Sequence, residues 1–169
     1  MSACWRAGAL LLVLVVALSS GGCGGSDAPK TKEEFIAEAD TVCERLAASF
    51  AKAGSTNPQT PDEIGTANSV LAELYDDLAR DLSDLTAPPG TAGAGARDYI
   101  AAIQRSDTLV QRMKATSLEL ATAAHGRDPR RLAKAGNDLR SALDAFRAAR
   151  AEADRLAVDY GFNTCGNLS

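Results

Sequence analysis

Apolar residues recur at intervals of three and four along most of the chain after residue 31, and this spacing limits the possible folds more than any other feature. It is the period of an α-helix that buries one face, and no stretch of strand length alternates apolar with polar residues. Alanine, the strongest helix former, is abundant, whereas aromatic residues make up only 5% of the chain. The spacing therefore predicts an all-α protein.

Four segments carry this period, and breaks that contain Gly, Pro or both separate them. The expected helices cover about 32–53, 61–85, 97–124 and 129–160. Capping residues mark the start of three of them, and Gly161 is the expected left-handed residue after the last. The candidate caps are Thr31 with Glu34, Thr60 with Glu63, and Asp128 before Pro129.

The connections between these segments are short, so sequential helices are expected to be antiparallel neighbours. The heptad-like spacing of the last two segments favours packing at about 20°. The sequence therefore predicts one domain over 31–169, an up-down-up-down antiparallel four-helix bundle.

The first 22 residues have the pattern of an export signal. Arg6 supplies positive charge, and residues 7–18 form an apolar run of twelve residues. That run is shorter than the roughly 20 residues of a membrane-spanning helix but suits a signal peptide. We therefore expect the segment 1–22 to be removed.

Small residues and then Cys23 follow the apolar run, and this order resembles the signal of bacterial lipoproteins. In that family the cysteine becomes the first mature residue and carries a diacylglyceryl group. Gly21 and Gly22 fit the family pattern, while Ser20 stands where Leu is usual. The resemblance implies a membrane anchor at Cys23; the alternatives are a secreted chain cut nearby and an uncleaved anchor. Residues 23–30 read as a flexible tether.

The chain contains four cysteines, of which Cys4 lies in the signal and Cys23 would carry lipid. Cys43 and Cys165 remain, and in an oxidising compartment two such cysteines most simply pair. The pairing requires the segment 162–166 to turn back along the first helix. Free or intermolecular thiols and a redox role are the alternatives, although no Cys-x-x-Cys is present.

Two short motifs carry a second resemblance: Ala-Asp-Thr-Val-Cys ending at Cys43, and Tyr-Gly-Phe-Asn-Thr-Cys-Gly over 160–166. They resemble a group of small exported lipoproteins of high-GC Gram-positive bacteria with a helical body. Membership would imply no assigned activity.

A basic cluster lies at the turn into the last helix, where cations oppose the helix dipole. It is a candidate site for an anionic partner, such as a lipid headgroup or a cell-envelope polymer, and the alternative is an ordinary solvated surface. Its members are Arg127, Arg130, Arg131 and Lys134.

Polar residues on the apolar stripes could line a small pocket between helices, namely Tyr99, Ser106, Ser117 and Tyr160. The alternative is that such serines bond to helical carbonyls and that the tyrosines place their hydroxyls at the rim.

Other polar features point to no chemistry. His125 is the single histidine, which excludes a multi-histidine metal site, and the acids of the second helix read as a solvated face. Gly90, Gly93 and Gly95 do not form a phosphate-binding motif. Asn-Leu-Ser at 167–169 matches a glycosylation triplet, which has no bearing on a bacterial export product.

The formal charge of -4 argues against binding to nucleic acid. We expect no catalytic residues, metal or cofactor. The leading hypothesis is a lipid-anchored, non-enzymatic envelope or interaction module that contacts the membrane through its anchor, with an envelope protein or anionic polymer as candidate partner. The alternative is a carrier of a small molecule or ion in the bundle interior.

Overall fold

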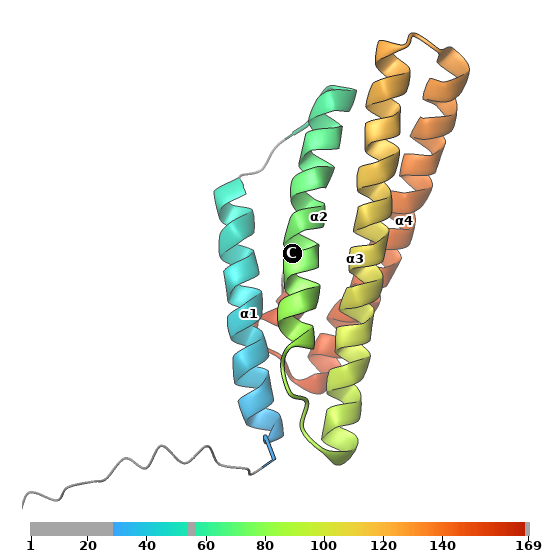
Figure 1. Cartoon of the computed structure of the whole chain (residues 1–169). Coiled ribbons are helices and arrows are strands. Elements are labelled where there is room, and N and C mark those ends of the chain that lie inside the picture. Colours follow the sequence, from blue (N-terminus) through green and yellow to red (C-terminus); the bar gives the residue numbers. More distant parts are fainter. Residues whose placement is uncertain (1–28, 54–56, 168–169) are drawn as a thin grey trace, which may run out of the picture.

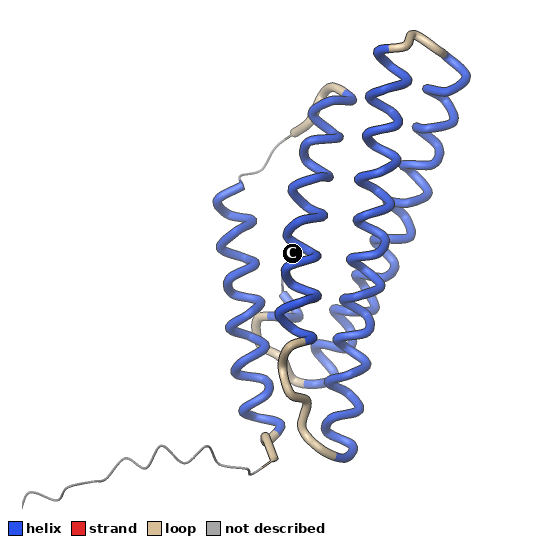
Figure 2. The backbone as a smooth tube through the Cα atoms, in the orientation of Figure 1, coloured by secondary structure: helices blue, strands red, loops and turns tan. Residues whose placement is uncertain are grey.

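The computed structural model describes residues 29–53 and 57–167. These residues form four α-helices and a short 3-10 helix, and none of them lies in a strand. The elements are α1 (Lys32–Ala53), α2 (Pro61–Ser83), α3 (Gly90–His125), α4 (Pro129–Tyr160) and η1 (Cys165–Asn167). The all-α four-helix prediction is confirmed (Figure 2). The signal segment 1–22, Cys23 and most of the tether lie outside the described residues.

The chain runs up α1, down α2, up α3 and down α4 in the view of Figure 1. The helices differ in length: α3 and α4 have 36 and 32 residues, whereas α1 and α2 have 22 and 23. The turn between α3 and α4 therefore stands beyond the ends of α1 and α2 (Figure 1). We call this the open end of the bundle, and the opposite end, where α1 starts and α4 finishes, the closed end.

The predicted capping residues lie at the starts of α1, α2 and α4 and accept hydrogen bonds from backbone N–H groups there. The Thr60 side chain accepts the Glu63 N–H while Glu63 accepts the Thr60 N–H, which is a complete capping box. Thr31 and Glu34 make the same reciprocal pair at α1. Asp128 accepts the first N–H groups of α4. Two donors that helix geometry would leave unpaired are thus satisfied at each start.

The predicted start of the third helix was wrong. Helix α3 begins at Gly90, seven residues before the expected Arg97. Pro89 occupies the N-cap position with extended backbone, and the small residues after it pack closely. A Cβ atom on Gly93 would lie 1.8 Å from the Pro88 carbonyl oxygen. Gly93 is thus required by the close approach of the chain before the helix. The second helix ends at Ser83, two residues earlier than expected.

The main core lies at the closed end, where all four helices and the C-terminal tail contribute buried side chains. A smaller cluster farther along contains Ala72, Tyr75 and Val110, with Phe50 and Phe146 packed against it. Helix α1 contributes to the core only along its first part. Its last buried residue is Leu46, and none of residues 47–53 is buried. The open end of α2 is therefore covered less completely than its closed end.

Candidate functional site

The C-terminal tail is fastened to α1 by a disulfide. Cys43 and Cys165 are bonded, with their Cα atoms 5.2 Å apart, so the predicted intramolecular pairing is confirmed. Gly161 adopts φ 99°, and the Phe162 N–H donates to the Ala157 carbonyl, as in a Schellman ending. This turn sends the tail back along α1, as the pairing requires.

Asp40 forms the polar half of the same attachment, which sequence analysis missed. Its carboxylate is buried and accepts the backbone N–H groups of Asn163, Thr164 and Cys165 at 2.9, 2.9 and 3.1 Å. The Asn163 side-chain amide adds a fourth hydrogen bond at 3.2 Å. An acid on the core-facing stripe, three residues before a cysteine, was the signal that could have revealed it. We call Asp40, Cys43 and residues 161–167 the clasp.

Aromatic side chains fill the space beneath the clasp. Phe162 lies 4.7 Å from the Tyr99 ring and 4.9 Å from the Tyr160 ring, measured between centroids. The Tyr99 hydroxyl is 3.8 Å from Cys43 Sγ, and burial raises the pKa of this tyrosine well above its usual value. This packing makes the closed end a structural element rather than an open site.

The structure brings only part of the proposed interior pocket together. Tyr99 and Tyr160 meet through Phe162, but Ser117 lies 18 residues farther along α3 than Tyr99, about 27 Å at 1.5 Å per residue. Ser106 and Ser117 are fully buried and donate to the Ala102 and Lys114 carbonyls, at 3.0 and 2.8 Å. The four residues therefore do not line one small cavity in the described part of the chain.

The basic cluster is exposed at the open end, and acids accompany part of it. Arg131 pairs with Glu119 of α3 at 3.2 Å, and Lys134 pairs with Asp138 at 2.5 Å. The Asp138 carboxylate raises the pKa of Lys134. Arg127 and Arg130 are exposed at the turn, where Arg127 has φ 51°. The four side chains share a region of surface, but the acids reduce its net charge.

The remaining polar features include two links between helices. His125 Nε2 lies 2.8 Å from the Asp62 carboxylate and joins the end of α3 to the start of α2. Arg150 donates to the Tyr75 hydroxyl at 2.6 Å and to Asp154 at 2.8 Å. Burial opposes the charge of Arg150, but Tyr75 and Asp154 favour it and leave its pKa raised. Among the described residues no group of three or more His, Cys, Asp or Glu could hold a metal ion.

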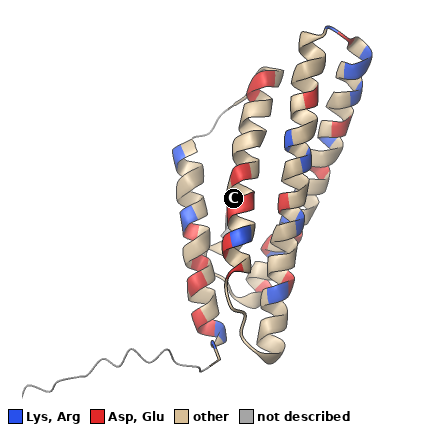
Figure 3. Cartoon of the chain, in the orientation of Figure 1, with Lys and Arg blue, Asp and Glu red and all other residues tan. Residues whose placement is uncertain are grey.

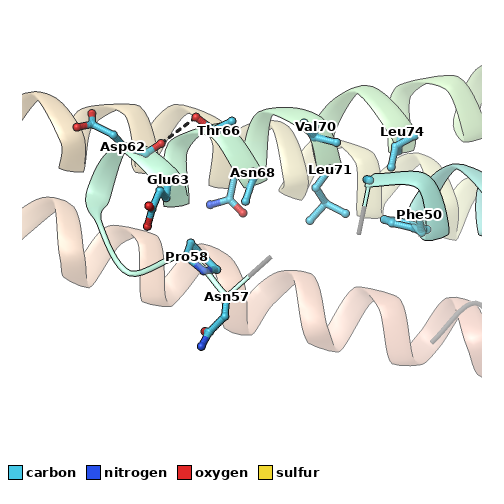
Figure 4. Close-up of a pocket in the computed structure, with 12 residues that line it drawn as sticks. Phe50, Asn57, Pro58, Asp62, Glu63, Thr66, Asn68, Val70, Leu71 and Leu74 are labelled. Atoms are coloured by element: carbon cyan, nitrogen blue, oxygen red, sulfur yellow. Dashed lines mark hydrogen bonds between the residues drawn. The ribbon is translucent and has the colours of Figure 1, made fainter. Parts of the chain in front are cut away.

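A groove opens between the end of α1 and the first half of α2 (Figure 4). Its main cavity has a volume of about 1030 Å³, and mostly apolar side chains line it. A second cavity of about 340 Å³ continues toward the closed end and shares Leu74 with the first. The main cavity is lined by Phe50, Ala53, Asn57, Pro58, Asp62, Glu63, Thr66, Ala67, Asn68, Val70, Leu71 and Leu74. We call the two cavities together the groove.

The sequence also did not reveal the groove, because the apolar period over about 61–85 predicted that one whole face of this helix would be buried. Val70, which lines it, is 40% exposed. The charged residues that line the two cavities are Asp62, Glu63, Asp77, Asp81 and Arg45, a balance of one positive against four negative groups, or -3. The groove is thus an apolar surface with an acidic rim.

Comparison with known proteins adds no relationship, since no protein family, curated protein or solved structure matches the chain. Within the described residues, no helix combines the length and the apolar character that crossing a membrane requires. The candidate functional site therefore rests on the geometry of the groove.

Proposed function

We propose that this chain is a lipid-anchored protein outside the cytosol that acts as a non-enzymatic interaction module. Cys23 would carry the lipid, and the groove between α1 and α2 would receive the partner. The groove is the observation that carries the proposal, because it is a large, mostly apolar surface held open on a bundle whose other end is closed.

The disulfide supports the location. Disulfides persist in oxidising compartments and are rare in the cytosol, and the Cys43–Cys165 bond joins residues 122 positions apart. A protein folded in a reducing compartment would have to hold α1 against the tail through Asp40 and apolar packing alone. Export through the segment 1–22 would supply the setting in which the bond forms.

The position of the groove supports its presentation to a partner. Nine residue steps separate Cys23 from Lys32, so the start of α1 could stand at most about 32 Å from the lipid. The groove begins at the other end of α1, a helix of 22 residues and about 33 Å. An upright molecule would therefore turn the groove and the basic cluster toward the cell envelope, which favours an envelope protein or polymer over lipid headgroups as partner.

A pair of cysteine variants tests the anchor. Cys23→Ser should release the chain from the membrane fraction, whereas Cys4→Ser, which also removes a leader thiol, should leave it attached. Mass spectrometry of the mature amino terminus should find diacylglyceryl on Cys23. An unmodified terminus, or a membrane fraction unchanged by Cys23→Ser, would refute the anchor and favour the secreted alternative.

A further inference from the structure

We infer that the groove binds an amphipathic α-helix of a partner protein, one whose apolar stripe is flanked by Lys or Arg. This inference deepens the proposed function and rests on it. The dimensions of the groove, the spacing of its apolar residues and its charge support it.

The dimensions suit one face of a helix. The α2 residues of the main cavity extend from Asp62 to Leu74, twelve steps or about 18 Å along the axis. The main cavity, about 1030 Å³ in volume, therefore runs along about three turns of α2, a length that matches one face of a short partner helix.

The floor of the groove has the spacing that receives a helical stripe. Ala67, Val70, Leu71 and Leu74 follow one another at three, one and three residues, so they share one face of α2. Phe50 of α1 faces them across the groove (Figure 4). Amphipathic helices bind such grooves through apolar residues three and four positions apart.

The rim selects a cationic partner. Asp62 is paired with His125 and Asp81 with Arg45, but Glu63 accepts, within the described part of the chain, only the backbone N–H groups of Gln59 and Thr60. Asp77 shares Arg80 with Asp76, so two carboxylates divide one guanidinium. Acids also dominate the exposed side of α2 (Figure 3). The excess negative charge attracts Lys and Arg and repels an anionic amphiphile such as a phospholipid.

Fluorescence anisotropy with a labelled peptide tests the inference. The protein is the mature chain in zwitterionic lipid nanodiscs, with empty discs as the blank. The probe is a helical peptide of about 14 residues, roughly 21 Å long, with a leucine stripe flanked by lysines. A matched peptide has glutamates in place of the lysines. We expect the lysine peptide to bind at least about tenfold more tightly, and this advantage to shrink at high salt.

Variants locate the binding. Val70→Glu places a charge on the apolar floor and should weaken binding of the lysine peptide about tenfold or more. Val158→Glu is the matched control, because Val158 is 64% exposed on α4 and lines neither cavity of the groove. The double variant Glu63→Gln with Asp77→Asn leaves the floor intact and should remove most of the salt dependence. Circular dichroism verifies the fold of each variant.

Several outcomes would overturn the inference: equal affinity for the two peptides, equal effects of Val70→Glu and Val158→Glu, or capture of a fluorescent fatty acid in place of the peptide. The mass of Cys23 is measured on the same preparation. A lipidated chain that fails to bind therefore rejects the groove assignment alone, whereas an unlipidated chain that binds rejects the anchor alone.

Discussion

At the scale of single residues, Asp40 connects the two ends of the chain more directly than any apolar contact. Both of its carboxylate oxygens are used: one accepts from the backbone and side chain of Asn163, the other from the backbone of Thr164 and Cys165. Consecutive backbone N–H groups that point at one anion form a compact binding arrangement. Without Asp40, the buried Cys165 N–H would lose its acceptor at the place where the tail crosses α1.

Replacing Asp40 with Asn should therefore be costly although the two side chains have the same shape. The new NH₂ group would face backbone donors, so at least one buried N–H would lose its acceptor and the other bonds would lose their charge assistance. We expect Asp40→Asn to lower the free energy of unfolding by about 2–4 kcal/mol. Urea denaturation of the oxidised protein measures this change.

Asp144→Asn is the control for that substitution. Asp144 pairs with Arg147 at 3.5 Å on the exposed face of α4, and such surface pairs contribute at most about 1 kcal/mol. If the two variants unfold at the same urea concentration, the Asp40 carboxylate does not hold the tail.

The two parts of the clasp differed in how far the sequence could predict them. The Cys43–Cys165 bond followed from counting cysteines in an exported chain, and Gly161 predicted the turn that makes it possible. Asp40 could not be assigned in the same way, because its partners are backbone N–H groups of residues 163–165, which have no sequence signature. Its position on the core-facing stripe, three residues before Cys43, could have marked it as a candidate but does not identify those partners.

At the scale of helices, two glycines should respond oppositely to the same substitution. Gly95 lies in α3, and a Cβ atom there would be 2.7 Å from Cδ2 of the Tyr160 ring. Gly136 lies in α4, where the nearest atom to an added Cβ is Leu120 Cδ1 at 4.0 Å. Alanine in place of a helical glycine gains about 0.5–1 kcal/mol when it fits.

We therefore expect Gly136→Ala to stabilise the protein by about 0.5–1 kcal/mol and Gly95→Ala to destabilise it by about 1–3 kcal/mol, because the Tyr160 ring must move out of a packed core. Thermal unfolding of the two variants measures the sign directly. An increase in melting temperature for both would mean that α3 and α4 do not approach closely at Gly95.

Helix α1 is the element that depends most on the clasp. It has no buried residue after Leu46, and its link to the tail is covalent at Cys43. Closing a loop of about 120 residues contributes up to roughly 4.9 kcal/mol in the chain-entropy estimate. Reduction should therefore increase amide hydrogen exchange in α1 far more than in the central turns of α3 and α4.

Hydrogen–deuterium exchange with and without reductant measures this difference peptide by peptide. Cys43→Ser should reproduce the exchange pattern of the reduced wild type, and reductant should then have no further effect. Uniform acceleration across all four helices would instead show that the bundle unfolds as a single unit when the bond is lost.

At the scale of the whole molecule, the groove exists because α1 buries no residue after Leu46. Periodicity identified four helices and their core faces, but it cannot show that α1 stops burying residues at Leu46 while α2 continues its apolar stripe beside it. Where the buried face of a neighbouring helix ends depends on tertiary packing, so the apolar positions Leu71 and Leu74 could not be distinguished from core positions. For Ser106 and Ser117 the sequence offered a pocket as one possibility, but in the structure both serines donate hydrogen bonds to carbonyl groups of their own helix.

The three tyrosines of the chain give the whole molecule a predictable response to alkali. The pKa of each is raised, chiefly by burial: Tyr75 and Tyr99 lie in the interior, and Tyr160 has a buried hydroxyl with no hydrogen-bond partner among the described residues. The folded protein then binds more protons than the unfolded chain once the pH exceeds about 10, the ordinary tyrosine pKa. The stability linked to these tyrosines is therefore fully present below that pH and is lost as the pH rises through the raised values.

We expect the free energy of unfolding to fall steeply above about pH 10, and tyrosinate absorbance at 295 nm to rise together with unfolding rather than before it. Tyr99→Phe should reduce the steepness, because it removes the most strongly shifted hydroxyl, which lies 3.8 Å from the disulfide sulfur of Cys43. Near neutral pH the same variant should unfold like the wild type. Tyrosine titration near pH 10 in a protein that stays folded would contradict the buried placement of these rings, and with it the closed end on which the clasp depends.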